Sequence, residues 1–127
     1  MSQAPNDRKY SAEHQWALPE ADGTIVVGIT DYAQETLGDL VFVQLPEIGS
    51  EVTANEQVAV VESVKTASDV FAPISGKIIA VNDAAADAPE TINEDAYAAW
   101  LFRIQPSNPA EYDDLMDADT YLSANQA

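Results

Sequence analysis

The chain has 127 residues, of which 46% are hydrophobic, and no stretch approaches the ~20 consecutive apolar residues of a membrane-spanning helix. This length predicts a single domain over residues 1–127 with one hydrophobic core. A formal net charge of −17 predicts repulsion from phosphate backbones and anionic lipids, so we expect neither nucleic acid nor a membrane as a partner.

The N-terminus, M-S-Q-A-P-N-D-R-K-Y, is the first segment along the chain. It lacks the apolar core of a secretory signal, and it is too short and too poor in arginine for an organellar transit peptide. We therefore expect residues 1–9 to be a flexible N-terminal segment and the protein to act in a bacterial-type cytoplasm.

Most of the remaining chain is predicted to form short β-strands separated by turns. The predicted strands are His14–Leu18, Thr24–Ile29, Leu40–Gln44, Gln57–Ser63, Asp69–Ala72, Lys77–Val81 and Trp100–Ile104. Their aromatic residues, Trp16, Phe42, Phe71 and Trp100, are expected to pack in a core. This rhythm of strands and turns is typical of a β-sandwich or barrel.

Two helices are predicted to interrupt the strands. The first is short: Asp31 is the expected N-cap, with Gln34 three residues on, and Gly38 is expected to end the helix at a positive φ. The second begins near Asn108, where Glu111 is expected to complete a capping box. On this second helix the expected packing face is formed by Tyr112, Leu115 and Met116.

The stretch V-V-E-S-V-K-T-A-S-D-V-F-A, residues 60–72, places a lysine between two apolar strand segments. The closeness of these segments requires a tight reversal near Val64–Thr66, with Lys65 at or beside the tip. Because Val64 is β-branched, we expect no positive φ there. Such a lysine is either a charge that keeps the tip solvated or an attachment point for a swinging cofactor.

Few residues are available for direct catalysis, since the chain has one histidine, no cysteine and no glycine-rich phosphate loop. We interpret His14 mainly as a partly exposed strand residue, although Glu13 lies beside it. The acidic run D-D-L-M-D-A-D at 113–119 lacks the glycine of a calcium loop, so no metal site is expected. A carrier would need no catalytic residue, which favours the attachment interpretation of Lys65.

Three stretches carry a resemblance to a known family. They are V-G-I-T-D-Y-A-Q-E-T-L-G-D-L-V-F-V-Q-L-P-E-I-G (27–49), V-E-S-V-K-T-A-S-D-V-F-A-P-I-S-G-K-I (61–78) and L-F-R-I-Q-P-S-N-P-A-E (101–111). Together they closely resemble the H-proteins of the glycine cleavage system, and the likeness extends from about Tyr10 to Tyr121.

The resemblance implies a carrier without enzymatic activity that bears lipoate covalently on Lys65, in the E-S-V-K-T motif. It implies three partners: glycine decarboxylase, which loads an aminomethyl group, aminomethyltransferase, which unloads it, and dihydrolipoyl dehydrogenase, which reoxidises the arm. A lipoyl or octanoyl transferase, or a lipoate ligase, would attach the cofactor. The reactive sulfurs would then belong to the lipoyl group, in a chain without cysteine.

The fold implied by the resemblance is mainly β, a biotinyl/lipoyl-domain-like flattened barrel or sandwich of two antiparallel sheets, with short helices that include one near the C-terminus. In this family the loaded arm folds into a cleft that shields it from water. By position, the matching cleft residues are Glu13, Gln15 and Asp69. Gln15 departs from the usual glutamate and offers no carboxylate, so we expect Glu13 or Asp69 to provide the countercharge to the amine.

A second departure is D-A-Y-A-A-W at 95–100, where Ala99 replaces the usual glycine; this predicts a negative φ or strain at that turn. Other interpretations stay open at this point. They are a biotin carboxyl carrier, a lipoyl domain of a dehydrogenase complex, a related carrier that relays lipoyl groups to other proteins, and an unmodified acidic interaction module.

Overall fold

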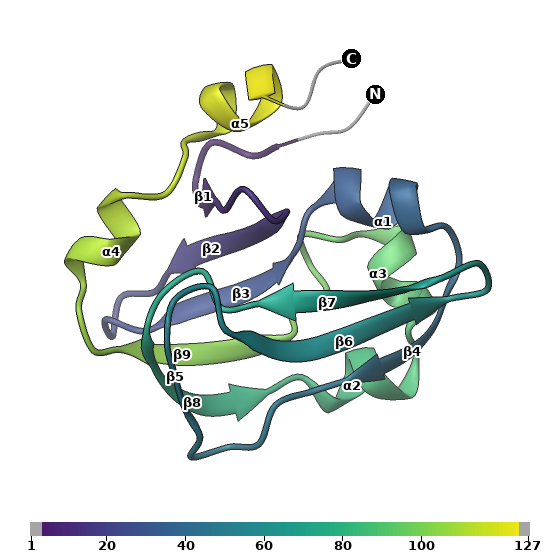
Figure 1. Cartoon of the computed structure of the whole chain (residues 1–127), viewed down its shortest axis with the longest axis horizontal. Coiled ribbons are helices and arrows are strands. Elements are labelled where there is room, and N and C mark those ends of the chain that lie inside the picture. The colour runs from purple at the N-terminus through teal and green to yellow at the C-terminus, as the bar shows by residue number, and fades with distance from the viewer. Residues whose placement is uncertain (1–3, 125–127) are drawn as a thin grey trace.

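The structure is a computed structural model that describes residues 4–124, and it consists mainly of strands in two antiparallel sheets (Figure 1). The strands are β1 (Lys9–Tyr10), β2 (Gln15–Pro19), β3 (Ile25–Ile29), β4 (Leu40–Gln44), β5 (Glu51–Val52), β6 (Gln57–Ser63), β7 (Ala67–Phe71), β8 (Gly76–Val81) and β9 (Phe102–Pro106). One sheet has the order β1-β2-β3-β9-β8-β5 and the other β4-β6-β7. The predicted class, two antiparallel sheets with short helices, is confirmed.

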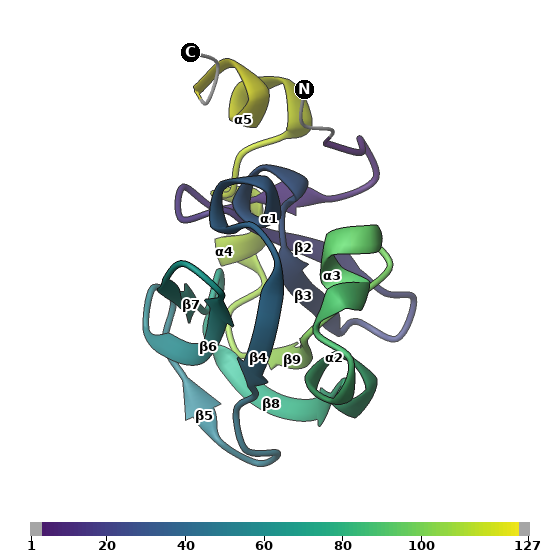
Figure 2. The same ribbon diagram turned by 90° about the vertical axis from the view of Figure 1, so that its right-hand side faces the viewer.

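The described part of the chain also has five short helices, of which α4 and α5 follow the last strand. They are α1 (Asp31–Leu37), α2 (Asp83–Asp87), α3 (Glu90–Glu94), α4 (Ala110–Asp113) and α5 (Ala118–Ala124). Figure 2 shows α2 and α3 beside β4, and α5 next to the N-terminal strand β1. Helices α2 and α3 were not predicted, because residues 83–94 are too short and too polar to show an apolar period.

The caps of the helices differ in detail from the predictions. Helix α1 is capped by Thr30, whose Oγ1 accepts from the N–H of Ala33 at 3.2 Å, so the predicted cap at Asp31 was wrong by one residue. Thr30 takes the cap position because its backbone is still extended there. The carboxylate of Asp31 instead accepts from the Gln34 side chain at 2.8 Å, while Gly38 ends the helix with φ of 86°, as predicted.

The second predicted helix is shorter than expected. Helix α4 has four residues, and its Glu111 forms no capping box, because the carboxylate accepts from the N–H and hydroxyl of Ser75 at 2.8 and 3.1 Å. Met116 lies beyond the helix and pairs through its backbone with Tyr10. The predicted helical face was therefore wrong at Leu115 and Met116, which both lie beyond α4, although both side chains pack against the buried clusters as expected. Met116 fastens the C-terminal region to β1.

The main core lies between the two sheets and is built from the inward side chains of both. Val27, Val61, Ile74, Ile78, Phe102 and Ile104 are among its fully buried members. Trp16 is also buried, in a second cluster with Tyr10 and Tyr121. Phe42, however, is 47% exposed, so the prediction that it packs in the core was wrong.

The N-terminal segment is described only in part, since residues 1–3 lie outside the described residues. The hydroxyl of Tyr10 donates to the carbonyl of Pro5 at 2.5 Å, and the Arg8 guanidinium lies 4.6 Å from the centre of the Trp16 ring. The flexibility of residues 1–9 and the organisation of residues 1–127 as one domain stay predictions.

Candidate functional site

The reversal between β6 and β7 presents Lys65 at its tip, as predicted (Figure 1). The hydroxyl of Ser63 accepts from the N–H groups of Lys65 and Thr66 at 3.2 and 3.1 Å, and the Ser63 N–H donates to the Thr66 carbonyl at 2.7 Å. A serine hydroxyl that binds the following amides can form a tight turn without glycine. Val64 has no positive φ, which confirms the expectation from its β-branched side chain.

Lys65 itself is exposed, and among residues 4–124 no carboxylate lies within 4.0 Å of its ammonium group. Its side chain passes close to Gly38, where an added Cβ would lie only 3.1 Å from the Lys65 Cε. The N–H of Val64 donates to the carbonyl of Asp39 at 3.1 Å. The tip therefore rests on the connection between α1 and β4 while its amine stays free.

This connection is held by one side chain from α3. The amide of Asn93 donates to the carbonyl of Gly38 and to the side chain of Gln34, both at 2.9 Å. The oxygen of the same amide accepts from the N–H of Leu40 at 2.8 Å. Because Asn93 bonds on both sides of the turn, the support beneath the lysine is fixed from a third element.

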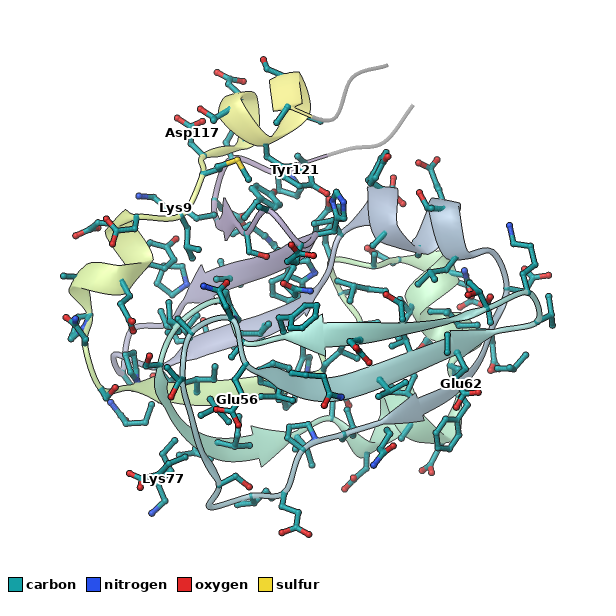
Figure 3. The ribbon with its side chains drawn as sticks, viewed as in Figure 1. Lys9, Glu56, Glu62, Lys77, Asp117 and Tyr121 are labelled. Carbon is teal, nitrogen blue, oxygen red and sulfur yellow. The ribbon has the colours of Figure 1, made fainter. Side chains whose placement is uncertain are left out.

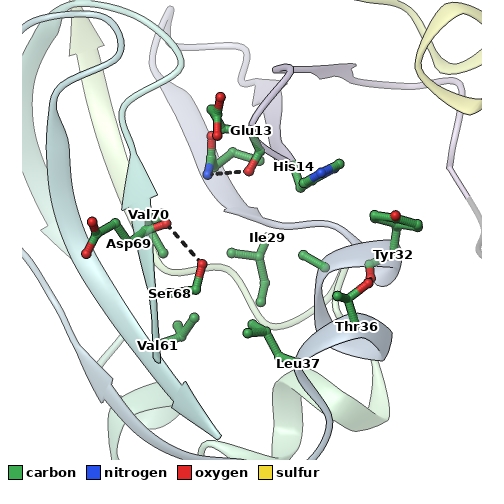
Figure 4. A pocket seen from close by; sticks show the side chains of 12 residues that line it. Glu13, His14, Ile29, Tyr32, Thr36, Leu37, Val61, Ser68, Asp69 and Val70 are labelled. Atoms are coloured by element: carbon green, nitrogen blue, oxygen red, sulfur yellow. Dashed lines mark hydrogen bonds between the residues drawn. The ribbon is translucent and has the colours of Figure 1, made fainter. Parts of the chain in front are cut away.

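A cleft of about 190 Å³ lies beside the hairpin (Figure 4). The lining residues are 13–15, Ile29, Tyr32, Ala33, Thr36, Leu37, Val61 and 68–70. Its floor is apolar and comes from Ile29, Leu37 and Val61, while Glu13 and His14 stand above it in Figure 4. An apolar floor with a few polar groups is the usual composition of a small-molecule site.

The three sequence-predicted cleft residues lie around this cleft in different ways. Glu13 is exposed, at the rim. Asp69 contributes backbone, but its carboxylate points away from the cleft in Figure 4. Asp69 pairs with Val60 on the outer face of the sheet, and strand alternation turns its neighbour Ser68 toward the cleft instead.

Gln15 is 2% exposed, and its side chain is used within the turn that joins β1 and β2. Its Oε1 accepts from the hydroxyl of Ser11 at 2.6 Å, and its Nε2 donates to the carbonyl of Glu13 at 2.9 Å. These bonds satisfy the buried amide and fix the backbone that carries Glu13. Gln15 therefore shapes one wall of the cleft.

His14 occupies the left-handed position of this three-residue turn, with φ of 72°, a conformation uncommon outside glycine. Its Nδ1 lies 2.8 Å from the hydroxyl of Tyr121, which is 2.7 Å from Oγ1 of Thr30. Burial lowers the pKa of His14, against the opposing effect of the Glu13 charge. Burial also raises the pKa of Tyr121 to about 12. The ring is thus held as a cleft wall by the C-terminal helix.

Several cleft residues were missed by the sequence analysis. His14 was predicted to be a strand residue, and Ser68, Tyr32 and Thr36 were not predicted to line a cleft. A signal for Thr36 was present, because on a helix it follows Tyr32 by four residues and so shares its face. The signal for Ser68 was its place next to Asp69 in a strand, where neighbours face opposite sides.

Two negative observations concern residues 4–124. Within them, no group of three or more histidine, aspartate or glutamate side chains is arranged to hold a metal ion. None of the helices described there is both long enough and apolar enough to span a bilayer.

Ala99 has no positive φ, which confirms the negative φ expected at this departure from the family pattern.

Comparison with known proteins gives one consistent family. The family model described as glycine cleavage H-protein matches residues 8–127. A glycine cleavage system H protein of Burkholderia cenocepacia is 58% identical over 121 residues, which cover 95% of this chain and 96% of the relative. Glycine cleavage system H protein 2 of Pseudomonas aeruginosa is 52% identical over 127 residues, which cover 100% of this chain and 98% of the relative.

The fold is similar to that of a solved structure as well. The crystal structure of a glycine cleavage system H protein from Mycobacterium marinum matches with a TM-score of 0.87 and 50% identity, covering 95% of this chain and 98% of that one. The chain belongs to the glycine cleavage H-protein family, whose members carry a lipoyl group on a lysine and have no enzymatic activity of their own.

Proposed function

We propose that Lys65 is the lysine that carries the lipoyl group. The observation that supports this most strongly is the tip of the β6–β7 hairpin, where Lys65 is exposed and, within the described residues, unpaired. An amine in this position can be reached by an attaching enzyme, and the turn bonds made by Ser63 keep it facing outward. The lipoyl group, once attached, supplies a dithiolane that accepts the aminomethyl group and is later reoxidised.

The chain's own residues fit such an arm. The cleft is lined by Ser68, three residues after Lys65, and by Leu37, next to the glycine under the lysine side chain. An attached hydrocarbon arm could therefore turn back along the hairpin onto an apolar floor, where burial of its carbons is favourable. Exclusion of water there protects a labile group that the arm carries.

We propose further that Glu13 supplies the charge facing a loaded amine in this cleft. Glu13 is the carboxylate at the rim, whereas the Asp69 carboxylate points to the outer face and the Gln15 amide is bonded within its own turn. A carboxylate near a protonated amine stabilises its charged form. Of the two candidates expected from the sequence, Glu13 is the better placed.

The matched variants Glu13→Gln and Asp69→Asn test this assignment. Each removes one negative charge with little change in shape. Hydrolysis of the loaded group is measured from the ammonia and formaldehyde that it releases. Its rate is expected to become several-fold faster in Glu13→Gln and to stay unchanged in Asp69→Asn. Equal rates in all three proteins would remove Glu13 from this role.

As a member of its family, the chain works as the lipoyl shuttle between glycine decarboxylase, aminomethyltransferase and dihydrolipoyl dehydrogenase. We propose that a lipoyl or octanoyl transferase, or a lipoate ligase, completes its set of partners. The test is a reconstituted system in which glycine-dependent NADH formation is measured with the lipoylated chain. Lys65→Arg is expected to abolish NADH formation. The control Lys77→Arg, on β8 at the other end of the molecule (Figure 3), is expected to leave it unchanged.

The domain organisation and the cellular location of the chain are also proposals. We propose that residues 1–127 form one domain, which is supported by relatives that align over nearly the whole chain. We propose a bacterial-type cytoplasm as its location, which is supported by the bacterial origin of the relatives compared above.

A further inference from the structure

Three of the five large apolar side chains that stay exposed within residues 4–124 lie in or beside the Lys65 hairpin. Val41 is 55% exposed, Phe42 47% and Val64 71%. Val64 directly precedes Lys65, and its N–H donates to the carbonyl of Asp39 at 3.1 Å, so β4 begins next to the tip. We refer to Val41, Phe42 and Val64 together as the apolar step. A cluster of exposed apolar side chains on a soluble domain often marks an interaction site.

The exposure of two neighbouring residues on β4 has a backbone cause. Leu40 pairs with Ser63 and Phe42 pairs with Glu62, so Val41 is an extra residue in a β-bulge. Without the bulge, strand alternation would turn one of the two inward, because successive side chains point to opposite faces. With it, both side chains remain outside. Bulges of this kind often re-aim side chains next to functional sites.

The apolar step is also held in place. Asn93 bonds to Gly38 and to Leu40, which flank the point where Val64 is attached to the β4 connection. The tip and the first residues of β4 are therefore tied together before any partner arrives. A surface that is already ordered binds with less loss of conformational entropy than one that must be ordered on binding.

We propose that the apolar step is the docking surface for the enzyme that attaches the lipoyl group to Lys65, an inference that rests on the proposed role of Lys65. In that reaction an amide bond forms between Lys65 Nζ and the lipoyl carboxyl carbon. The bond from this carbon to the phosphate oxygen of an adenylate breaks, AMP leaves and the amine loses a proton.

The attaching enzyme is favoured as the occupant of this surface because it is the partner that acts on the unmodified lysine. An enzyme that acylates Nζ must approach the tip itself, so its surface has to cover the residues that adjoin Lys65. The enzymes of the cleavage system act on the far end of the arm, which lets them remain farther from the hairpin. The apolar step adjoins Lys65 through Val64 and is continuous with the attachment site.

The charges around the apolar step predict the polarity and charge of the enzyme surface that docks there. Asp39 is exposed beside Val64, and Glu62 lies opposite Phe42 on β6, where Figure 3 labels it. An apolar centre with an acidic rim is complemented by an apolar patch with a basic rim. The rate of attachment at low protein concentration is therefore expected to fall as ionic strength rises.

The test uses the full unmodified chain and a lipoate–protein ligase supplied with lipoate and MgATP. The rate of lipoyl attachment is measured by intact mass spectrometry over a range of chain concentrations. The variants are Val64→Ser and the double variant Val41→Ser/Phe42→Ser. The matched control is Ile48→Ser, which changes a residue that is 64% exposed on the β4–β5 connection, away from the tip (Figure 1). Circular dichroism and thermal midpoints verify that each variant is folded.

We expect kcat/KM to fall on the order of tenfold in both step variants, mainly through KM, and to be unchanged in the control. Equal kcat/KM in all proteins would overturn the docking surface while leaving Lys65 as the attachment site. Failure of the folded wild-type chain to be modified would overturn both proposals. Unchanged attachment with slower loading by glycine decarboxylase would assign the surface to that enzyme instead. A wild-type dimer that the variants convert to monomers, with attachment unchanged, would assign it to self-association.

Discussion

The turns at 63–66 and 11–15 both reverse the chain without glycine, and they keep their shapes in different ways. The first is local, because the Ser63 hydroxyl binds two amides within the turn and leaves Lys65 free. The second uses the left-handed conformation of His14 and a hydrogen bond to Tyr121, which is 107 residues away. The shape of the turn that carries Lys65 is thus set within the turn, which rests on the α1–β4 connection through Asp39, whereas a wall of the cleft depends on contacts between the two ends of the chain.

The largest effect is expected from Tyr121→Ala, which removes the remote support of the His14 turn. Tyr121 is 1% exposed and stacks on Tyr10 with ring centres 4.9 Å apart. Truncation of a buried aromatic side chain is expected to lower the free energy of unfolding by roughly 3–5 kcal/mol, measured by denaturant unfolding. Tyr121→Phe, which removes only the hydroxyl, is expected to lower it by about 1 kcal/mol.

Attachment of lipoate to the folded fraction of Tyr121→Ala is expected to proceed at the wild-type rate, since the Ser63 turn is local. A slower rate of attachment at Lys65 would show that the turn at 63–66 depends on the turn at 11–15, contrary to the difference described between them.

The backbone of the second turn is tested by His14→Ala and His14→Gly. Both variants lose the bond to Tyr121, so their difference isolates the cost of a positive φ for a residue with a Cβ. His14→Ala is expected to be less stable than His14→Gly by about 1 kcal/mol. Equal stability in denaturant titrations would mean that the turn relaxes to another conformation when the ring is removed.

The first turn is tested by Ser63→Ala, which removes one oxygen that serves two amides. Because the tip is exposed, water can replace part of the lost bonding, so the free energy of unfolding is expected to fall by only ~0.5–1 kcal/mol. The sharper measurement is hydrogen exchange. The amides of Lys65 and Thr66 are expected to exchange faster, whereas that of His14, in the other turn, is expected to serve as an unchanged control.

The smallest effect is a dependence on pH. Burial lowers the pKa of His14 in the folded state below the ordinary value of 6.5, so the unfolded chain binds a proton more readily than the folded one. Stability from this residue is present above about pH 6.5 and is lost as the pH falls toward the folded-state pKa. His14→Asn, which tolerates a positive φ but does not titrate, is the control. The stability difference between wild type and His14→Asn is expected to shrink from pH 7.5 to 5.5; a constant or growing difference would contradict this assignment.

The sequence alone was sufficient for what depends on neighbouring residues. The short connection between the predicted strands 57–63 and 69–72 placed Lys65 at a tip, and the β-branched Val64 indicated the correct sign of φ. Apolar periods and turn residues also indicated seven of the nine described strands, all except the two-residue strands β1 and β5. The arrangement in two antiparallel sheets was implied by the resemblance to the family.

The cleft could be predicted only in part, since its walls meet through tertiary contacts. No local pattern shows that Tyr121 reaches His14, or that Asn93 supports Gly38. The resemblance to the family indicated Asp69 as a cleft residue by its position in the sequence. In the structure, the pairing of Asp69 with Val60 puts its carboxylate on the outer face of the sheet.

The most direct test of the central claim is tandem mass spectrometry of the proteolysed chain after incubation with a lipoate–protein ligase, lipoate and MgATP. The account predicts a single lipoyl group on Lys65, with Lys9 and Lys77 unmodified, and no gain of mass in folded Lys65→Arg. A lipoyl group on another lysine, or a folded wild-type chain that stays unmodified beside a lipoylated control protein, would contradict the assignment of Lys65.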